Sequence, residues 1–441
     1  MVAAASCFAQ ILSLIDRTGF ARAVRHHQAE RGAKGFSWWE QFVSMLFCQM
    51  GSAHSLREIC GGLATALGKL VHLGVRRTPT RSTLAYANAH RPWQLYETLF
   101  YQVLTQCQAM AALKRRRFRF KHPLRTLDTT LIELCATVFD WARFVRTKGA
   151  IKLHLHLDHQ GCLPCWALVT AGDVNDVRVA QQLTFAPGTI VAMDRGYLDY
   201  ALYQRWTTTE VWFVTRPRTN MLYAVLDRRP VPSRNAVLAD EVIRLTGPHA
   251  ADRCTVPLRQ VTIWDEPQQR TLTFLTNLMH LAASTIAAIY KERWQIELLF
   301  KALKQHLRIK TFVGTSEDAV QIQLWIALLA MLLLKFLQLK STWPWSLSTL
   351  AALLRFNLSV DLSGPVGLAQ RALWMSGHHP DADASDALRH VILDSSRGNL
   401  IGESAPTPSH TQDLRREDTQ GQIILDSSGS GVFVCGIISR R

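Results

Sequence analysis

The chain has 441 residues, of which 48% are apolar and 19% charged, and this balance excludes a wholly disordered protein. Its 50 Lys and Arg residues outnumber 34 Asp and Glu residues, which gives a formal charge of +16. Such an excess favours a polyanionic partner, nucleic acid before membrane, over a merely basic soluble protein. The length predicts about two to four domains, because single cores stop growing below this size.

Residues 1–113 are expected to form an all-helical, DNA-binding N-terminal domain. The segment 36–50 has an apolar stripe at helical spacing, and a second helix begins with Ser55 and Glu58 in the pattern of a capping box. The first residues lack a basic stretch before their apolar run, so a signal peptide is not expected. Four basic residues suit contact with DNA, although a helical scaffold with solvated basic faces explains them nearly as well: Arg76, Arg77, Arg81 and Arg91.

A strongly basic segment follows this domain. Six of the nine residues from Lys114 to His122 are Lys or Arg, and Phe118 and Phe120 lie among them. A basic run between domains is most often a solvated linker. The interleaved aromatic residues leave open a second reading, in which the segment follows a phosphate backbone.

From residue 123 the apolar pattern changes from a helical period to a period of two, which predicts strands. Residues 150–160 and 162–172 are expected to pair as antiparallel strands. A buried parallel strand is expected at 188–194, because its apolar run is continuous and ends in an acid. Strands and helices alternate, which predicts a mixed α/β fold for residues 114–221, with further strands at 123–134 and 210–218 and helices at 175–183 and 198–206.

The nine cysteines are scattered, and Cys162 and Cys165 form the only CxxC pair in the sequence. No second pair follows at the spacing of a zinc site. We therefore interpret the cysteines as reduced thiols of a cytosolic protein rather than as zinc ligands.

The rest of the chain divides into four segments. Residues 222–278 are punctuated by Pro and have β character, which predicts a β-rich insertion. Helices are expected again over 279–345 and in a C-terminal helical segment at 346–376. The apolar run Leu324–Leu334 has about half the length that spans a bilayer, so it predicts a buried core helix. Apolar periodicity fades over 377–441, which predicts a disordered tail.

Residues 290–308 are expected to form one amphipathic helix with an unusual polar face. At 100° per residue, one face is apolar and Glu297 is the only acid on the other. That polar row comprises Tyr290, Arg293, Glu297, Lys301, Lys304 and Arg308. Arg293, Glu297 and Lys301 form a ladder with four-residue steps. A solvated ladder of this kind is the simplest reading, and each pair then contributes only about 0.2–0.5 kcal/mol.

A lone acid within a basic row also suits a metal ion held beside DNA phosphates. Two further acids are candidates because a carboxylate is costly to bury unpaired on an apolar strand, and because strand ends carry ligand-binding groups in open α/β sheets. They are Asp128, inside the strand at 123–134, and Asp194, at the end of the strand at 188–194. Competing acids stand in turns or at helix starts, where Asp serves as a cap, namely Asp140, Asp158, Asp173, Asp176 and Asp199.

Together these residues resemble the insertion-sequence-four group of bacterial DDE transposases. Tyr290, Arg293, Glu297 and Lys304 have the spacing of that group's Tyr-Arg-Glu-Lys signature. The sequence "LDTTLIEL", followed by "TKGAIKLH", is similar to its first acidic motif, and "DRGY" at Asp194 is similar to its second. The resemblance implies an α/β protein with an RNase H-like catalytic core that is interrupted by a β-rich insertion and preceded by a helical DNA-binding domain.

The resemblance also implies the catalytic residues. Asp128, Asp194 and Glu297 would hold two Mg²⁺ ions, for which Mn²⁺ can substitute, and would act in phosphodiester cleavage and strand transfer. Contacts to DNA would come from Tyr290, Arg293 and Lys304, from Trp294 stacking on a flipped base, and from Arg195 and Lys301, which adjoin the motifs.

The implied activity is cut-and-paste transposition of an insertion sequence through a hairpin at the transposon end. The implied partners are terminal inverted repeats, target DNA and a second copy of the chain in a synaptic complex that cuts in trans. The implied location is the bacterial cytoplasm at the nucleoid, with no membrane. Two other readings stay open: a catalytically silent or domesticated DNA-binding protein derived from a transposase, and a general RNase H-like nuclease indifferent to the end sequence.

Overall fold

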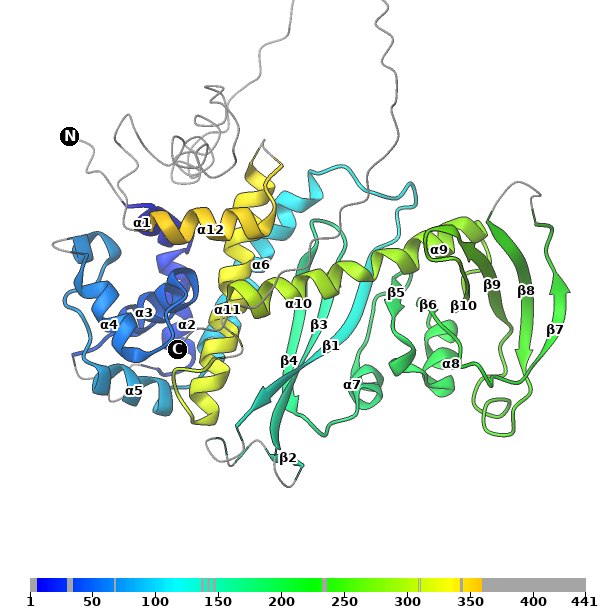
Figure 1. Cartoon of the computed structure of the whole chain (residues 1–441), viewed down its shortest axis with the longest axis horizontal. Helices are drawn as coiled ribbons and strands as arrows, with labels where there is room; N and C mark the ends of the chain where they lie inside the picture. Colours follow the sequence, from blue (N-terminus) through cyan, green and yellow to red (C-terminus); the bar gives the residue numbers. More distant parts are fainter. Residues whose placement is uncertain are drawn as a thin grey trace, which may run out of the picture. The chain divides into compact units, whose positions relative to one another are not determined.

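The structure, a computed structural model, describes residues 6–358 apart from 30–34, 67–68, 136–138, 140, 142, 146–147, 232–235, 308, 310 and 342–343. Within these residues, helices come first, a large sheet with helices on both faces follows, and two further helices close the described chain (Figure 1). The mixed α/β prediction is therefore confirmed. The predicted tail at 377–441 and the end of the predicted C-terminal helical segment lie outside the described residues.

The N-terminal region is helical, as predicted. Ser37 caps the third helix, in a capping box with Glu40. The Ser55 hydroxyl accepts from the Glu58 N–H, but the Glu58 carboxylate accepts from the backbone of His54, one residue before the expected position. The elements are α1 (Cys7–Leu12), α2 (Arg17–His26), α3 (Trp38–Gly51), α4 (Leu56–Ala64), a 3₁₀ turn (Lys69–Leu73), α5 (Arg81–His90) and α6 (Gln94–Ala112).

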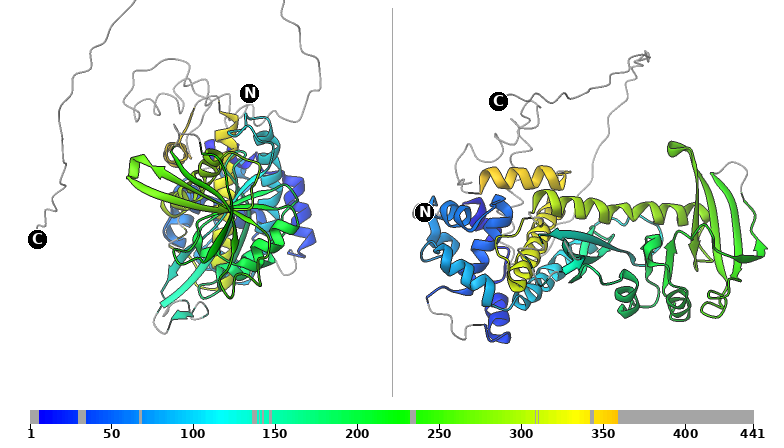
Figure 2. Two further views of the ribbon diagram at one scale, coloured as in Figure 1. Left: turned by 90° about the vertical axis from the view of Figure 1, so that its right-hand side faces the viewer. Right: turned by 60° about the horizontal axis from the view of Figure 1, so that its bottom comes forward.

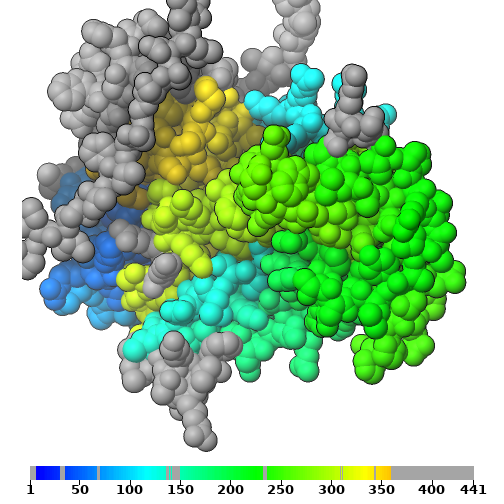
Figure 3. All heavy atoms as spheres, turned by 45° about the vertical axis from the view of Figure 1, so that its right-hand side comes forward, coloured from blue at the N-terminus to red at the C-terminus, as the bar shows by residue number. Residues whose placement is uncertain are grey.

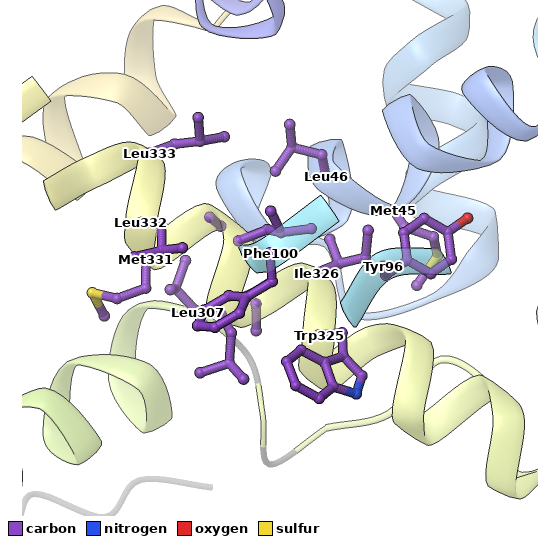
Figure 4. Close-up of a cluster of buried hydrophobic side chains, with 14 of the residues drawn as sticks. Met45, Leu46, Tyr96, Phe100, Leu307, Trp325, Ile326, Met331, Leu332 and Leu333 are labelled. Carbon is purple, nitrogen blue, oxygen red and sulfur yellow. The ribbon is translucent and has the colours of Figure 1, made fainter. Parts of the chain in front are cut away.

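A long apolar helix, α11 (Glu317–Lys340), lies at the centre of the main core. It packs against α3, α5, α6 and α12 (Leu347–Asn357) and also reaches β4. Figure 4 shows Trp325 and Ile326 of α11 clustered with Phe100 of α6. Although α11 is long and apolar enough to cross a membrane, its apolar window is entirely buried inside the protein. The predicted core helix at Leu324–Leu334 is therefore confirmed, within a longer helix.

All ten strands of the described chain belong to one sheet, and nine of them follow the order β2-β3-β1-β5-β6-β10-β9-β8-β7. Strand β4 pairs with β3 as the predicted antiparallel hairpin, and β1, β5 and β6 are parallel neighbours. The strands are β1 (Leu124–Leu134), β2 (Arg143–Val145), β3 (Lys148–Asp158), β4 (Leu163–Ala171), β5 (Ile190–Met193), β6 (Trp212–Thr215), β7 (Tyr223–Arg228), β8 (Val237–Leu245), β9 (Leu258–Asp265) and β10 (Arg270–Thr276).

The predicted β-rich segment, 222–278, is observed and extends the same sheet. Its last strand, β10, pairs antiparallel with β6, and β9, β8 and β7 follow outward. The space-filling view shows this segment (green) packed directly against the preceding strands (Figure 3). Inside it, the buried guanidinium of Arg259 pairs with Asp240 at 2.7 Å and donates to the Leu278 and Leu281 carbonyls, which lie just before the next helix.

The middle of the sheet is covered on both faces (Figure 2). On one face, Leu124 of β1 belongs to a buried cluster with Ile286 of α9 (Ala283–Glu292). On the other face, Leu127 of β1 belongs to a cluster with Trp206 of α8 (Tyr200–Thr208). Because side chains alternate along a strand, even-numbered residues of β1 in this stretch face α9 and odd-numbered residues face α8.

The prediction of one helix over 290–308 was wrong in one respect. Two helices, α9 and α10 (Trp294–His306), meet at Arg293. At the junction, the N–H groups of Arg293 and Ile296 bond to carbonyls three residues back, the spacing of a tight 3₁₀ turn. The sequence pattern did not signal this break, because the junction contains neither Pro nor Gly.

Candidate active site

The two strand acids predicted from the sequence, Asp128 and Asp194, lie next to each other at the sheet. Strands β1 and β5 are parallel, and their last paired residues are Leu127 and Met193. Asp128 directly follows Leu127, and Asp194 directly follows Met193. By the alternation of side chains, both acids lie on the face of Leu124, which α9 covers.

Arg293 links the third predicted acid to this pair. Its Nη1 donates to Oδ2 of Asp128 at 3.2 Å, and its Nη2 donates to Oε1 of Glu297 at 2.5 Å. The side chains of Arg293 and Asp128 are 13% and 17% exposed, whereas that of Glu297 is 31% exposed. The four-residue pair with Glu297 was predicted from the helix period. The contact with Asp128, 165 residues earlier in the chain, was not.

The carboxyl of Asp128 is in an electrostatically unfavourable place. Burial raises its pKa to about 6, and the negative charges of Asp194 and Glu297 add to this rise. The Thr129 N–H, which donates to Asp128 Oδ1 at 2.8 Å, and the Arg293 charge oppose it. Asp194 and Glu297 are therefore both close enough to Asp128 to repel its charge, and Arg293 offsets part of that repulsion.

The carboxylates of the three acids are donors that can bind a divalent cation. In this arrangement, however, those of Asp128 and Glu297 pair with Arg293. Among the residues that the structure describes, no three His, Cys, Asp or Glu side chains are grouped to hold a metal ion. Carboxylate oxygens are nevertheless the donors that Mg²⁺ takes. The Nε of Arg293 is buried without a hydrogen-bond partner in the described chain, so its guanidinium is incompletely satisfied where it lies. The residues therefore fit a divalent cation in the kind of donor they offer, while Arg293 occupies two of the three carboxylates in this arrangement.

The aromatic residues of the predicted site differ in exposure. The Tyr290 ring packs against Phe274 with a centroid separation of 5.0 Å, and the Arg293 guanidinium lies 5.6 Å from its centroid. Burial raises the pKa of Tyr290. Trp294 is 57% exposed, so more than half of its surface is accessible.

The three predicted lysine and arginine contacts lie around the same helix and turn. Lys304 donates from Nζ to the Leu131 carbonyl at 3.0 Å, so it also fastens α10 to β1. Lys301 is exposed and helps to line a surface hollow of about 370 Å³. Arg195 is exposed and directly follows Asp194 in a 3₁₀ turn. The DNA-binding roles of these residues stay predictions.

Most competing acids have other partners. Asp158 forms an ion pair with Arg125, and Asp176 with Lys152 at 2.9 Å. Asp199 caps α8 by accepting from a backbone N–H. Asp173 is exposed, and Asp140 lies outside the described residues. Cys162 and Cys165 are free thiols, and burial raises the pKa of Cys165 to about 11, which does not favour the thiolate that zinc requires.

The basic segment after α6 packs on the α9 side of the sheet. Phe118 and Phe120 stack at 4.8 Å and join the cluster that contains α9 residues. Arg117 pairs with the buried Glu292, the neighbour of Arg293, at 2.9 Å. The segment lines a surface hollow of about 860 Å³ through Arg115, Arg116, Arg117, Phe118, Arg119 and Lys121.

Two arginines of the helical region have contacts within it. Arg76 pairs with Glu40 at 3.4 Å. Arg91 donates to the Gln41 side chain at 3.0 Å and stacks over Trp38. Burial lowers the pKa of Arg91, which agrees with a role in packing rather than on an open basic face.

Sequence reasoning missed a polar chain on the opposite face of β1. Thr129 lies within hydrogen-bond distance of both Tyr197 and His154. Tyr197 belongs to the "DRGY" motif, which was the available signal. His154 stood at an inward position of an alternating strand, a signal that does not by itself identify a partner.

Residues 119–333 match the family described as the transposase DDE domain, and residues 4–76 match a family described as a domain of unknown function. A putative transposase, y4zB of Sinorhizobium fredii, is 32% identical over 262 residues, which are 58% of this chain and 71% of that protein. The probable transposase for insertion sequence element IS5377 of Geobacillus stearothermophilus is 29% identical over 278 residues, 62% of this chain and 72% of that protein.

A solved structure also resembles this chain distantly. It is the piggyBac transposase synaptic complex with hairpin DNA, matched over 88% of this chain and 79% of that chain. The sequence identity is 8% and the TM-score is 0.38.

Proposed function

This chain belongs to the family of insertion-sequence transposases with a DDE domain, and on that basis we propose that it moves an insertion sequence by cut-and-paste transposition. It would bind the terminal inverted repeats, cleave there with a hairpin at the transposon end, and join that end to target DNA. Residues 114–221 and 279–345 would form an RNase H-like catalytic core, with 222–278 inserted in it. A homodimer in a synaptic complex would place two ends together.

One observation carries this proposal. Two acids lie beside each other at neighbouring parallel strands, and a third acid from α10 is joined to one of them, Asp128, through Arg293. Ligand-binding groups gather at the carboxyl ends of parallel strands, and grouped carboxylates serve metal-dependent phosphodiester chemistry. A basic composition, with a formal charge of +16, suits a DNA substrate.

Asp128, Asp194 and Glu297 would hold the divalent ions that DDE transposases generally use, two Mg²⁺ for which Mn²⁺ can substitute. Such ions, when bound, activate water or a 3′-hydroxyl and stabilise the leaving oxygen. In this structure Arg293 pairs with both Asp128 and Glu297. Once Arg293 leaves these carboxylates, its fork of N–H groups matches the oxygens of a DNA phosphate.

The remaining predicted residues surround this group and would bind DNA. Trp294, more than half exposed, would stack on a flipped base, and stacking of this kind contributes about 1–3 kcal/mol per base. Phosphates would be held by Tyr290, Lys301, Lys304 and Arg195. The cations of the basic segment line one surface hollow beside the α9–α10 junction. This arrangement supports the interpretation that the segment follows a phosphate backbone.

The alternative is a DNA-binding protein that performs no chemistry. The observation that favours it is the pairing of Arg293 with two of the three acids, which would block the site if it were permanent. The two functions differ in whether added metal leads to cleavage.

The test is cleavage of labelled inverted-repeat DNA by the full chain with Mg²⁺ or Mn²⁺. We expect Glu297→Gln to reduce cleavage about a thousandfold or more while DNA binding persists, because only a ligand carboxylate is lost. Glu133→Gln, an exposed acid on β1, is the matched control and should cut normally. A wild-type protein that binds the ends but never cuts them would favour the silent alternative. Normal cutting by Glu297→Gln would remove Glu297 from the site.

A further inference from the structure

A continuous chain of hydrogen bonds crosses β1, β3 and β4 on the face of the sheet opposite the acids. Thr129 Oγ1 lies 2.6 Å from the Tyr197 hydroxyl and 2.8 Å from His154 Nδ1. His154 Nε2 lies 2.9 Å from Thr170 Oγ1, which in turn donates to the Ala171 carbonyl at 3.1 Å. Four side chains from four elements are thereby joined.

The direction of every proton in this chain follows from its last bond. Since the Thr170 hydroxyl donates to a carbonyl, it must accept from His154, which fixes the proton of the neutral imidazole on Nε2. His154 Nδ1 is then an acceptor and takes the Thr129 hydroxyl proton. Thr129 Oγ1 must therefore accept from the Tyr197 hydroxyl. Each hydroxyl has one proton, so only this arrangement satisfies all the bonds.

The surroundings hold these groups in their neutral forms. His154 is fully buried and Tyr197 is 2% exposed. Burial lowers the pKa of His154 to about 4 and raises that of Tyr197. A buried polar chain is costly unless every member is satisfied, and this chain is, so it defines one relative position for the elements it joins.

Two residues of this hydrogen-bonded chain are also bonded to the strand acids. The Thr129 N–H donates to the Asp128 carboxylate at 2.8 Å, so fixing Thr129 fixes the residue that orients Asp128. Asp194 begins the 3₁₀ turn that contains Tyr197, and the Tyr197 N–H donates to the Asp194 carbonyl at 3.2 Å. One hydroxyl–hydroxyl bond therefore ties the backbone of Asp194 to that of Asp128.

We propose that Tyr197, Thr129 and His154 are positioning residues that fix the separation of Asp128 and Asp194 from beneath the sheet. Strand β5 has only four residues and pairs with β1 over those four, so this side-chain tie extends a short stretch of backbone pairing to the turn after it. The proposal rests on the proposed function, because it assigns the two acids a shared metal. It gives the tyrosine of "DRGY" a task away from DNA.

The test compares variants that remove one hydroxyl with variants that keep it. Tyr197→Phe deletes one bond and Thr129→Val deletes two, neither with much change in side-chain size, whereas Thr129→Ser keeps the hydroxyl. Tyr96→Phe is the matched control: Tyr96 is also fully buried, and its hydroxyl has no partner in the described chain. All are made in the full chain, with melting temperature recorded for each.

Two readouts are used, Mn²⁺ affinity by electron paramagnetic resonance and cleavage of labelled end DNA resolved into kcat and KM. We expect Tyr197→Phe and Thr129→Val each to weaken Mn²⁺ binding about tenfold and to lower kcat with little change in KM. The double variant should lose no more than Thr129→Val alone, since Thr129→Val already removes the bond that Tyr197→Phe deletes. Thr129→Ser and Tyr96→Phe should stay within about twofold of wild type.

The outcomes separate the two proposals. If wild-type protein binds Mn²⁺ and cuts, but Tyr197→Phe and Thr129→Val match it in both readouts, the positioning role is overturned and the proposed function stands. If Tyr197→Phe melts early, Thr129→Val against Thr129→Ser decides, because both retain the tyrosine. Wild-type protein that neither binds Mn²⁺ nor cuts would overturn the proposed function, and the positioning role with it.

Discussion

The two faces of the sheet differ sharply at consecutive residues of β1. Asp128 lies on the α9 side among charges, with a raised pKa and an arginine partner. Thr129 lies on the α8 side in a neutral, fully bonded chain. One face carries groups that repel one another unless a cation joins them. The other carries groups whose hydrogen bonds are complete.

Reactive groups and the groups that position them can therefore occupy consecutive residues of one strand. The first kind lies in charged, accessible surroundings and the second in neutral, buried surroundings. Glu297 and Trp294 are substantially exposed, so ligands can reach the charged face. His154 and Tyr197 are inaccessible, so the neutral face cannot exchange its partners for water. Four sets of variants test this difference between the charged face and the neutral face.

Removing a charge from the reactive face should abolish chemistry. We expect Asp128→Asn to lower end cleavage about a thousandfold or more while leaving DNA binding intact, since it removes one ligand carboxylate. Asp173→Asn changes an exposed turn acid in the same way and should cut normally. Gel assays of cleavage and of binding, run on the same DNA, measure both. Comparable cleavage by the two variants would contradict the assignment.

Adding charge to the neutral face should destabilise the fold. Two buried histidines on this face have lowered pKa values, about 4 for His154 and about 3 for His156. Between their ordinary value of 6.5 and about 4, the unfolded chain binds more protons than the folded one, so stability falls as pH falls. His154 alone should remove about 3 kcal/mol by pH 4.

Urea unfolding at a series of pH values measures this loss. His154→Gln, which cannot become charged, should unfold with a shallower acid dependence between pH 6.5 and 4. His72→Gln provides the control, because His72 is exposed. An unchanged slope in His154→Gln would mean that the imidazole is protonated in the folded protein.

Replacing the cation that joins the acids should strengthen metal binding. Arg293→Gln leaves Asp128 and Glu297 without their partner, so we expect Mn²⁺ affinity without DNA to rise about tenfold. Arg293→Lys keeps the positive charge and should change the affinity less. The same titration in both variants gives the result, and weaker binding in Arg293→Gln would show that Arg293 supports the metal instead of competing with it.

A peripheral cation of the reactive face should matter least. Lys301→Gln is expected to weaken DNA binding a few-fold, equally for all sequences, and to lower the salt slope of the binding constant by about one. Lys340→Gln, at the end of α11, should leave the slope unchanged. Binding measured across a salt series decides, and equal slopes for Lys301→Gln and wild type would place Lys301 away from the backbone.

The sequence was sufficient for most elements, although not for the break between α9 and α10, and for the positions of residues that are defined locally. Asp194 could be predicted because an apolar strand ends on it, and the Arg293–Glu297 pair because the helix period is local. The bond from Arg293 to Asp128 could not, since it joins residues far apart in the chain and depends on which strand α10 crosses. The Thr129–His154 bond likewise depends on the register of two paired strands, which alternation alone leaves open.

The way in which the β-rich segment joins the sheet makes it a support for the helix that follows it. The chain leaves the core after β6 and returns as β10, directly beside it. Arg259 of β9 donates to the Leu278 and Leu281 carbonyls just before α9, and it pairs with Asp240 of β8. Ile243 of β8 and Leu258 of β9 belong to the same buried cluster as Leu127 of β1. Loss of these two strands would therefore remove buried contacts of the catalytic region and the hydrogen bonds that hold the start of α9.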